Sequence, residues 1–397
     1  MAHGFSEKKL KNLTPHIQKY VDSGKLPGVA CLVGRRGEEA YFHAYGYRDV
    51  ERQLDVSRDT IFRIYSMSKP ITSVALMMLY ERGLFQLDDS VSKYIPGWAD
   101  LSVYQSGSGG GIKTEPCKTP VTIKHLLTHT SGLTYGFMNS DPVDALYREK
   151  GIGSKGTLNS MMEDLASVPL LFQPGSRWNY SVSTDVCGAL VEHFSKQDLD
   201  VFVRENITGP LNMNKTGYQV HSMQADSFAA CYQFRKEGGY ILSDDPENSS
   251  YLSRPTFFSG GGGMVSTIDD YQRFAQMLLN KGELEGARVL GRKTVEYMSM
   301  NHMPGNVDLA AMGQPVFSET PYEGIGFGLG FSVVVNSAAA NVLDSVGEFA
   351  WGGAASTYFW VDPMEDLTVI FMTQLLPSST YPIRRELKTL IYQAIVD

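Results

Sequence analysis

The sequence predicts an α/β protein of the α+β type, in which an antiparallel sheet is built from both ends of the chain and carries helices on its faces. Three observations support this prediction: β-rich runs on both sides of a turn within residues 28–50, further β-rich runs after Gly324, and a long stretch of helical patterns between them. The terminal strands form one sheet only if both ends of the 397-residue chain meet.

The N-terminal part is predicted to be a helix followed by a hairpin. Residues 6–23 place apolar side chains at helical spacing, and Gly24 and Pro27 end that pattern. The β-rich runs of residues 28–50 flank the turn RRGEE, in which Gly37 supplies a loose φ angle.

The middle of the chain is mainly helical by its pattern. The strongest helix signal covers residues 67–83, and LDDSVSKYIP is expected to form a second helix that Pro96 ends. Residues 104–120 are predicted to be a loop, because they are rich in Gly, Ser, Thr and Pro. Further helices are expected at residues 121–129, 160–167, 184–195, 198–206 and 267–280.

The C-terminal part returns to β-rich runs at hairpin spacing, namely GIGFGLGFSVVVN, LDSVGEFAWGG, STYFWVDP and LTVIFMTQLL, before a last helix in YPIRRELKTLIYQAIV. We therefore expect a discontinuous sheet domain of residues 1–65 and 320–397 and an inserted, mainly helical domain of residues 66–319. The active site is expected in the cleft between these two domains.

The composition is that of a globular enzyme without nucleic acid or membrane partners. The formal net charge is −8, and no stretch approaches the roughly 18 apolar residues of a membrane-spanning helix. The N-terminus has no signal-peptide pattern, so a cytoplasmic location is expected. In that location the cysteines, which have neither CxxC nor metal-ligand spacing, are predicted to be free thiols: Cys31, Cys117, Cys187 and Cys231.

The first candidate catalytic motif is IYSMSK, residues 64–69. On a helix, Ser66 and Lys69 share one face about 5–6 Å apart at Cβ, so an uncharged lysine can reach the serine hydroxyl and take its proton. The helix N-terminus favours negative charge on the serine oxygen, and Pro70 is tolerated in the first turn. The alternative is an ordinary helix start with a solvated lysine, because SxxK alone is a weak motif.

The second motif is QPGSRWNYSV, which places Tyr180 in a turn just before a helix. A tyrosinate near a lysine ammonium is a credible general base, because the opposite charge lowers the pKa of the phenol. Taken alone, a core tyrosine is the better explanation of this position.

The third motif is Trp351-Gly352-Gly353, on a predicted strand of the C-terminal sheet. Glycines in a strand allow a ligand to approach the backbone closely, and a strand edge offers N–H donors for an oxyanion. The alternative is a β-bulge or a tight corner of the sheet.

Two other patterns are poor candidates for ligand sites. His125 and His129 have the i, i+4 spacing of a zinc pair, but Leu126 stands where such a motif needs Glu, so no metal is expected. SGGGGM at residues 259–264 lacks the lysine of a phosphate-binding loop.

The order of the motifs resembles the serine β-lactamase and penicillin-binding protein fold, and within it the family VIII carboxylesterases, which are similar to class C β-lactamases. The resemblance covers nearly the whole chain, through FRIYSMSKPITSVALMMLYERGLFQLDDSVSKYIP, VTIKHLLTHTSGL, FQPGSRWNYS, PLNMNKTG, SGGGGMVSTIDDYQRF and WGG. It implies a β-lactamase/transpeptidase-like fold, no cofactor, and a cleft that the glycines of SGGGGM help to line.

The resemblance also implies a role for each matching residue. Ser66 would be the nucleophile that accepts the acyl group, Lys69 would share its proton, and Tyr180 would be the base in acylation and would activate water for deacylation. The backbone N–H groups of Ser66 and Ala354 would form the oxyanion hole. Lys69 and Tyr180 should titrate as a coupled unit.

Two departures from the β-lactamase pattern favour neutral esters as substrates. Val182 stands where β-lactamases have an asparagine that holds the substrate amide, and Trp351 stands where they have a lysine or histidine that assists carboxylate binding. Substrate binding is therefore expected at Val182, Trp351, Gly352 and Gly353. The expected activity is that of a serine carboxylesterase acting on small-molecule, short-chain acyl esters. The alternatives are a β-lactamase, a D-amino-acid peptidase or an acyltransferase that uses the same acyl-enzyme.

Overall fold

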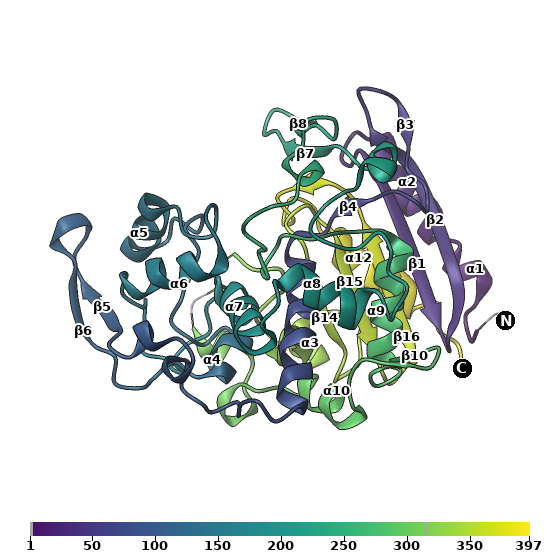
Figure 1. The fold of residues 1–397 in the computed structure, drawn as a ribbon. Helices are drawn as coiled ribbons and strands as arrows, with labels where there is room; N and C mark the ends of the chain where they lie inside the picture. The colour runs from purple at the N-terminus through teal and green to yellow at the C-terminus, as the bar shows by residue number, and fades with distance from the viewer. Residues whose placement is uncertain (1–2, 314, 316) are drawn as a thin grey trace.

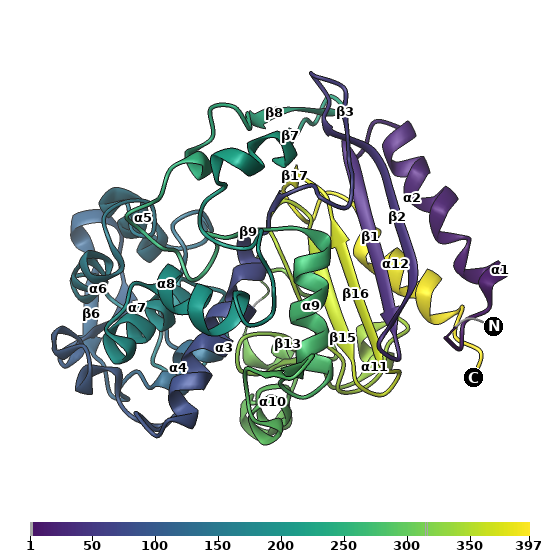
Figure 2. The same cartoon turned by 45° about the vertical axis from the view of Figure 1, so that its right-hand side comes forward.

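The computed structural model describes residues 3–313, 315 and 317–397, and an antiparallel sheet organises this part of the chain (Figures 1 and 2). Its strand order is β12-β13-β14-β15-β16-β1-β2-β3, so strands from the two ends of the chain meet where β16 pairs with β1. The strands are β1 (Gly28–Arg35), β2 (Glu38–Asp49), β3 (Leu54–Asp55), β12 (Ile325–Phe327), β13 (Ser332–Val334), β14 (Phe349–Gly352), β15 (Tyr358–Asp362) and β16 (Leu367–Met372). The predicted fold class is confirmed.

Different helices cover the two faces of this sheet (Figure 2). Cys31 and Val33 of β1 belong to a core with the two N-terminal helices and the last helix, whereas Ala30 and Leu32 belong to a core that includes α9 (Ile268–Leu279). Because side chains alternate along a strand, β1 contributes to both cores and is buried along its whole length. The helices of the first core are α1 (Glu7–Leu10), α2 (Leu13–Asp22) and α12 (Ile383–Tyr392).

A helical lobe lies beside the sheet, to the left in Figure 1. Its central helix is α7, whose first nine residues are all buried and which contacts α3, α4, α6 and α8. The helices of the lobe are α3 (Ser68–Glu81), α4 (Ile123–Leu127), α5 (Pro142–Lys150), α6 (Leu158–Ala166), α7 (Ser183–Ser195) and α8 (Leu199–Val203), which a π-helical turn (Arg204–Thr208) extends.

The remaining elements are short. They are helices α10 (Arg292–Met298) and α11 (Ser337–Ala340), and strands β4 (Phe62–Arg63), β7 (Cys231–Phe234), β8 (Tyr240–Asp244), β9 (Val265–Ser266), β10 (Glu283–Leu284), β11 (Ala287–Arg288) and β17 (Leu375–Leu376). Helix α9 falls within the predicted helical domain, yet it packs on β15, β16 and β1. The lobe itself therefore ends before α9.

Two segments differ from the sequence prediction. The predicted loop at residues 104–120 contains a hairpin of β5 (Ser102–Ser106) and β6 (Lys113–Pro116), which projects from the lobe at the far left of Figure 1. LDDSVSKYIP forms a 3-10 turn (Val91–Lys93) instead of a helix. The reason is that the N–H of Val91 and the C=O of Asp89 bond to the backbone of residues 121–123, which leaves them unavailable for a helix.

Among the described residues, none of the helices has the length and apolarity needed to cross a membrane. The four cysteines are free thiols, as predicted.

Candidate active site

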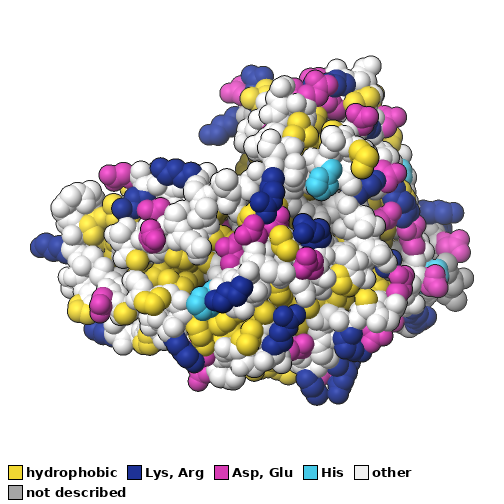
Figure 3. All heavy atoms as spheres, in the orientation of Figure 1, with side chains coloured by type: hydrophobic (Ala, Val, Ile, Leu, Met, Phe, Trp, Pro, Cys, Tyr) yellow, Lys and Arg dark blue, Asp and Glu magenta, His cyan; other side chains and the backbone are white. Residues whose placement is uncertain are grey.

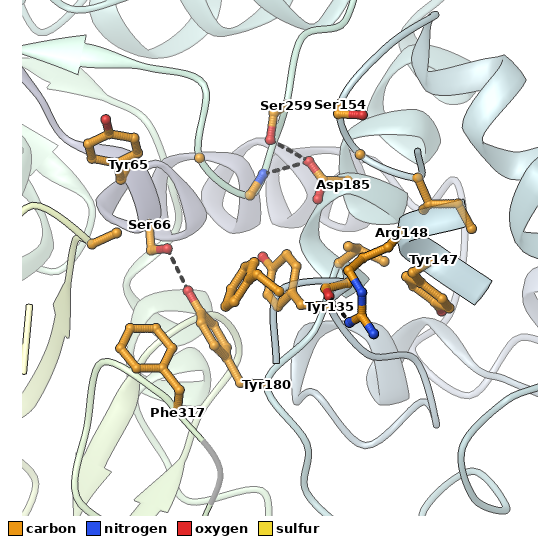
Figure 4. Close-up of a pocket in the computed structure, with 18 of the residues that line it drawn as sticks. Tyr65, Ser66, Tyr135, Tyr147, Arg148, Ser154, Tyr180, Asp185, Ser259 and Phe317 are labelled. Atoms are coloured by element: carbon orange, nitrogen blue, oxygen red, sulfur yellow. Dashed lines mark hydrogen bonds between the residues drawn. The ribbon is translucent and has the colours of Figure 1, made fainter. Parts of the chain in front are cut away.

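Ser66 lies in a 3-10 turn (Tyr65–Met67) that leads directly into α3. The preceding residue, Tyr65, has a φ of 41°, a left-handed conformation that costs a side chain of this size on the order of 1–3 kcal/mol. Strained residues of this kind cluster at functional sites, where the surrounding structure holds them in place. Tyr65 is thus placed to fix the position of Ser66. Ser66 borders a pocket of about 470 Å³ between the sheet and the lobe (Figure 4).

Lys69 follows one turn later and is almost completely buried. Its Nζ lies 3.2 Å from Ser66 Oγ and donates to the carbonyl of Gly261 at 2.6 Å. Burial lowers the pKa of Lys69 to about 7, although the negative charges of Asp185 and Glu319 act in the opposite direction. The amine is therefore uncharged in a large fraction of molecules at neutral pH, and an uncharged amine can accept the proton of the serine hydroxyl.

Tyr180 approaches the same oxygen from the lobe side, just before α7 (Figure 4). Its Oη donates a hydrogen bond of 2.6 Å to Ser66 Oγ. The ring is held edge-on by Trp351, with centroids 5.4 Å apart, and by His129 at 5.2 Å. Lys69, three positions after Ser66, and Tyr180, 114 positions after it, thus converge on the Ser66 hydroxyl.

The protonation state of Tyr180 differs from the sequence prediction. Burial raises the pKa of Tyr180 well above its usual value of 10, whereas the sequence suggested a phenol made more acidic by a nearby ammonium. The physical reason is that burial favours the neutral phenol and that the negative charge of Glu319 acts in the same direction. In the resting site the tyrosine is therefore a proton donor to Ser66, and the lysine is the group able to accept.

The glycines of the WGG motif lie against other parts of the protein. A Cβ at Gly353 would lie 2.4 Å from the carbonyl oxygen of Ile64, and a Cβ at Gly352 would lie 2.5 Å from Arg384 Nη1. The space that a Cβ would take at each glycine is filled by other parts of the protein, and neither glycine lines the pocket. Ala354, the next residue, does line it.

The two positions that distinguish the chain from β-lactamases differ in their place relative to the pocket. Val182 lines the pocket, and its contact with substrate stays a prediction. Trp351 does not, because its side chain is fully buried between the rings of Tyr180 and Phe327. Trp351 therefore supports Tyr180 from behind instead of adding apolar surface to the pocket.

The structure brings further residues to the pocket that the motifs did not indicate. Asp185 is a buried carboxylate in the first turn of α7, and its Oδ1 accepts from Ser259 Oγ and from the N–H of Gly261. A charged residue inside the buried run SVSTDVCGALV is a signal that could have been noticed in the sequence. Glu319 also lines the pocket and pairs with Arg384, but its loop sequence carries no comparable signal.

The two histidines considered as a zinc pair have other partners. His125 Nδ1 accepts from the N–H of Thr122 and completes the N-terminal cap of α4. His129 Nδ1 lies 3.1 Å from Ser181 Oγ, and its ring packs against Tyr180. Both side chains therefore have structural contacts, and the ring of His129 lies against a catalytic candidate.

Comparison with protein families gives one match across nearly the whole chain: the family model described as Beta-lactamase matches residues 13–393. The chain belongs to the beta-lactamase family. The resemblance inferred from the motifs is thereby confirmed, and the pocket described above lies in a β-lactamase/transpeptidase fold.

Relatives within the family match this chain over most of their length. Protein Rv1367c of Mycobacterium tuberculosis is 33% identical over 91% of this chain and 89% of its own length. Esterase EstB of Burkholderia gladioli is 31% identical over 88% of this chain and 86% of its own length. Among solved structures, EstCE1, described as a hydrolase with promiscuous acyltransferase activity, superposes with a TM-score of 0.79 at 26% identity, covering 98% of this chain and 99% of its own.

Proposed function

We propose that this chain is a serine carboxylesterase that hydrolyses short-chain acyl esters through an acyl-enzyme on Ser66. The observation that carries the proposal is the double contact of Ser66 Oγ, with Tyr180 Oη at 2.6 Å and Lys69 Nζ at 3.2 Å, at the edge of a pocket. A serine hydroxyl becomes an effective nucleophile when a base takes its proton. The name of the relative EstB, an esterase, agrees with this reaction class.

In the proposed acylation, uncharged Lys69 takes the hydroxyl proton while Ser66 Oγ bonds to the ester carbonyl carbon. The N–H groups of Ser66 and Ala354 receive the oxyanion that forms, because both residues border the pocket. Tyr180 then gives its proton to the departing alkoxide and regains one from the Lys69 ammonium. One proton has moved from the serine to the alcohol, and Lys69 is again uncharged.

Deacylation reverses these transfers with water in place of the alcohol. The water loses a proton to the pair of Lys69 and Tyr180 as its oxygen attacks the acyl carbonyl. Ser66 leaves and takes that proton back, which releases the carboxylic acid. Each group therefore acts as both base and acid within one cycle.

Transfer of the acyl group to an alcohol is the second candidate. The description of EstCE1 as a hydrolase with promiscuous acyltransferase activity supports it. The same acyl-enzyme serves both reactions, and they differ only in whether water or an alcohol attacks it. A β-lactamase or a D-amino-acid peptidase is less favoured, because Val182 and the buried Trp351 provide no amide or cation for a carboxylated amide substrate.

The proposal is tested with p-nitrophenyl acetate and butyrate on the wild type and on Ser66→Ala. We expect turnover by the wild type, loss of activity in the variant, and a phosphonate adduct on Ser66 after treatment with a fluorophosphonate. Product analysis with added alcohol measures acyl transfer, and nitrocefin measures lactam hydrolysis. Full activity of Ser66→Ala would exclude the assignment, and nitrocefin turnover above ester turnover would favour the β-lactamase.

A further inference from the structure

The buried carboxylate of Asp185 is the feature of the pocket that the proposed reaction leaves without a role. Asp185 Oδ1 accepts from Ser259 Oγ at 2.6 Å and from the N–H of Gly261 at 3.0 Å (Figure 4). Within the described part of the chain, no arginine or lysine forms a direct ion pair with it. Burial raises the pKa of the Asp185 carboxyl, whereas its two hydrogen bonds and the charge of Lys69 lower it, so Lys69 is the cation that can balance its charge.

Gly261 connects this carboxylate to Lys69. Asp185 holds the N–H of Gly261, while Lys69 Nζ donates to the C=O of the same residue at 2.6 Å. A Cβ at Gly261 would lie 2.9 Å from Asp185 Oδ2, so a larger residue there would have to displace the carboxylate. The adjacent carbonyl of Gly260 is fixed by Thr72 Oγ1 at 2.8 Å. The turn of residues 259–262 is therefore held between α7 and α3.

The charges around Lys69 single out Asp185. Two carboxylates raise the pKa of Lys69, Asp185 more than Glu319. Glu319 is already paired with Arg384 at 2.8 Å, so much of its charge is offset there. The other titratable groups near the lysine are uncharged at neutral pH, because burial raises the pKa of two phenols and lowers that of an imidazole: Tyr135, Tyr180 and His129.

We propose that Asp185 is a positioning residue for acyl transfer: it holds the turn of residues 259–262 so that the Gly261 carbonyl binds Lys69, and it supplies the counter-charge for the lysine ammonium. The ammonium forms when Lys69 takes the proton of Ser66, and a buried cation is stabilised by a nearby fixed anion. This inference rests on the proposed function, in which Lys69 is the base.

The test is Asp185→Asn, because asparagine keeps an acceptor oxygen for both donors and removes the charge. Without that charge the ammonium is less stable, so we expect the acid limb of the kcat/KM profile for p-nitrophenyl butyrate to move to lower pH by about one unit. We also expect kcat to fall about tenfold, because the lysine becomes a weaker base. An acid limb at the wild-type pH would overturn the proposal.

Ser259→Ala is the matched control, since it removes one hydrogen bond to Asp185 and leaves the carboxylate in place. Its acid limb should stay at the wild-type pH, and a purely structural role of Asp185 would instead give both variants the same profile. If Asp185→Asn does not fold, Asp185→Glu takes its place. The glutamate keeps the charge but displaces it by one methylene, so the limb should stay while kcat falls, and wild-type kcat would contradict the positioning role.

The rate of Ser66 labelling by a fluorophosphonate, measured between pH 5 and pH 9, separates this proposal from the proposed function. Labelling reports the Ser66 and Lys69 pair without requiring ester turnover. A wild-type protein that neither labels nor hydrolyses esters contradicts the proposed function. A wild-type protein that labels, with an unchanged limb in Asp185→Asn, contradicts only the role of Asp185.

Discussion

At the scale of single residues, burial decides which neighbour of Ser66 is able to accept a proton in the resting site. An amine loses its charge when it is buried and a phenol keeps its proton, and the Lys69 and Tyr180 side chains are both almost completely inaccessible. The lysine pKa is lowered to about 7, and that of the tyrosine is raised well above 10. The resting site therefore pairs an acceptor amine with a donor phenol on the two sides of one hydroxyl.

This pairing predicts the pH dependence of the reaction. Below about pH 7 Lys69 is an ammonium and cannot accept the proton, so kcat/KM should rise with pH through that value and then level off. Tyr180 should add no alkaline limb below pH 10, because its pKa is raised above that value. The measurement is a pH profile with p-nitrophenyl butyrate, corrected for spontaneous hydrolysis.

The control for this profile is Lys69→Arg, because a guanidinium stays charged at every accessible pH. Its activity should be low and should not recover in alkali. Maximal wild-type activity near pH 5, or an alkaline recovery of the arginine variant, would contradict the role of Lys69 as the base.

Removing one oxygen tests Tyr180. Tyr180→Phe deletes the donor to Ser66 Oγ but keeps the ring that packs against Trp351. We expect kcat to fall by about 10²–10⁴-fold with little change in KM, which is the usual range for a lost acid–base group. Tyr147→Phe is the matched control, because Tyr147 is also buried and lines the pocket but has no hydrogen bond to Ser66. Equal losses in both variants would point to a general disturbance of the pocket.

At the scale of elements, the end of β14 is fixed from behind by α12. Arg384 of α12 donates to the carbonyls of Gly353 and Thr357 at 2.9 and 2.7 Å, and it pairs with Glu319. These bonds hold the backbone that leads into Ala354, the second expected oxyanion donor. A helix on the far face of the sheet thereby determines the geometry of one wall of the pocket.

Gly352→Ala tests this arrangement. The new Cβ would come within 2.5 Å of Arg384 Nη1, and the guanidinium cannot yield without breaking its bonds to Gly353 and Thr357, in the turn between β14 and β15. Overpacking of this kind costs about 1–3 kcal/mol, so we expect a lower unfolding midpoint in urea together with a reduced kcat.

The control is Gly217→Ala, where an added Cβ meets nothing within 4 Å and φ is not in the left-handed region. Its stability and kcat should match those of the wild type. An unchanged kcat in Gly352→Ala would show that Arg384 does not influence the wall of the pocket that contains Ala354.

The surroundings of β14 show which features of the fold and the site could be predicted from the sequence. Periodicity and turn residues predicted β14, α3 and α7, because these signals depend on residues that are close together in the sequence. The order of the motifs predicted that Ser66, Lys69 and Tyr180 belong to one site. The packing of Trp351 behind Tyr180 and the contact of Gly352 with Arg384 depend on which chain segment lies opposite, and neighbouring residues do not encode that. The hairpin β5–β6 was missed for a related reason, since a glycine-rich composition is equally compatible with a loop.

At the scale of the whole molecule, charges of both signs are mixed on the visible surface, whereas the interior is divided into separate cores. Figure 3 shows positive and negative side chains interspersed over the visible face, so a net charge of −8 is not concentrated in one field there. The interior is divided by the sheet into two main cores, of which only the one with α3, α7 and α9 contains Tyr180 and Val182. The core beneath α1, α2 and α12 is linked to the pocket by the shared strands and by Arg384 of α12, which pairs with the pocket residue Glu319.

This division predicts that the second core controls stability without changing the chemistry. Leu387→Ala removes a fully buried side chain of α12 from that core, and such truncations cost about 2–5 kcal/mol. The midpoint of urea unfolding should fall accordingly, while kcat per folded molecule stays at the wild-type value. Leu343→Ala is the control, because this leucine is 49% exposed and its loss should matter little.

The strands of the sheet belong to both cores, since successive residues of β1 and β16 face opposite sides. Loss of the outer core should therefore unfold the active-site core in the same transition. In Leu387→Ala, esterase activity and far-ultraviolet circular dichroism should be lost at the same urea concentration. Activity that disappears before the helical signal would instead mean that the lobe and the sheet unfold separately. In that case the junction of β16 with β1, where the two ends of the chain meet, would not couple the pocket to the rest of the fold.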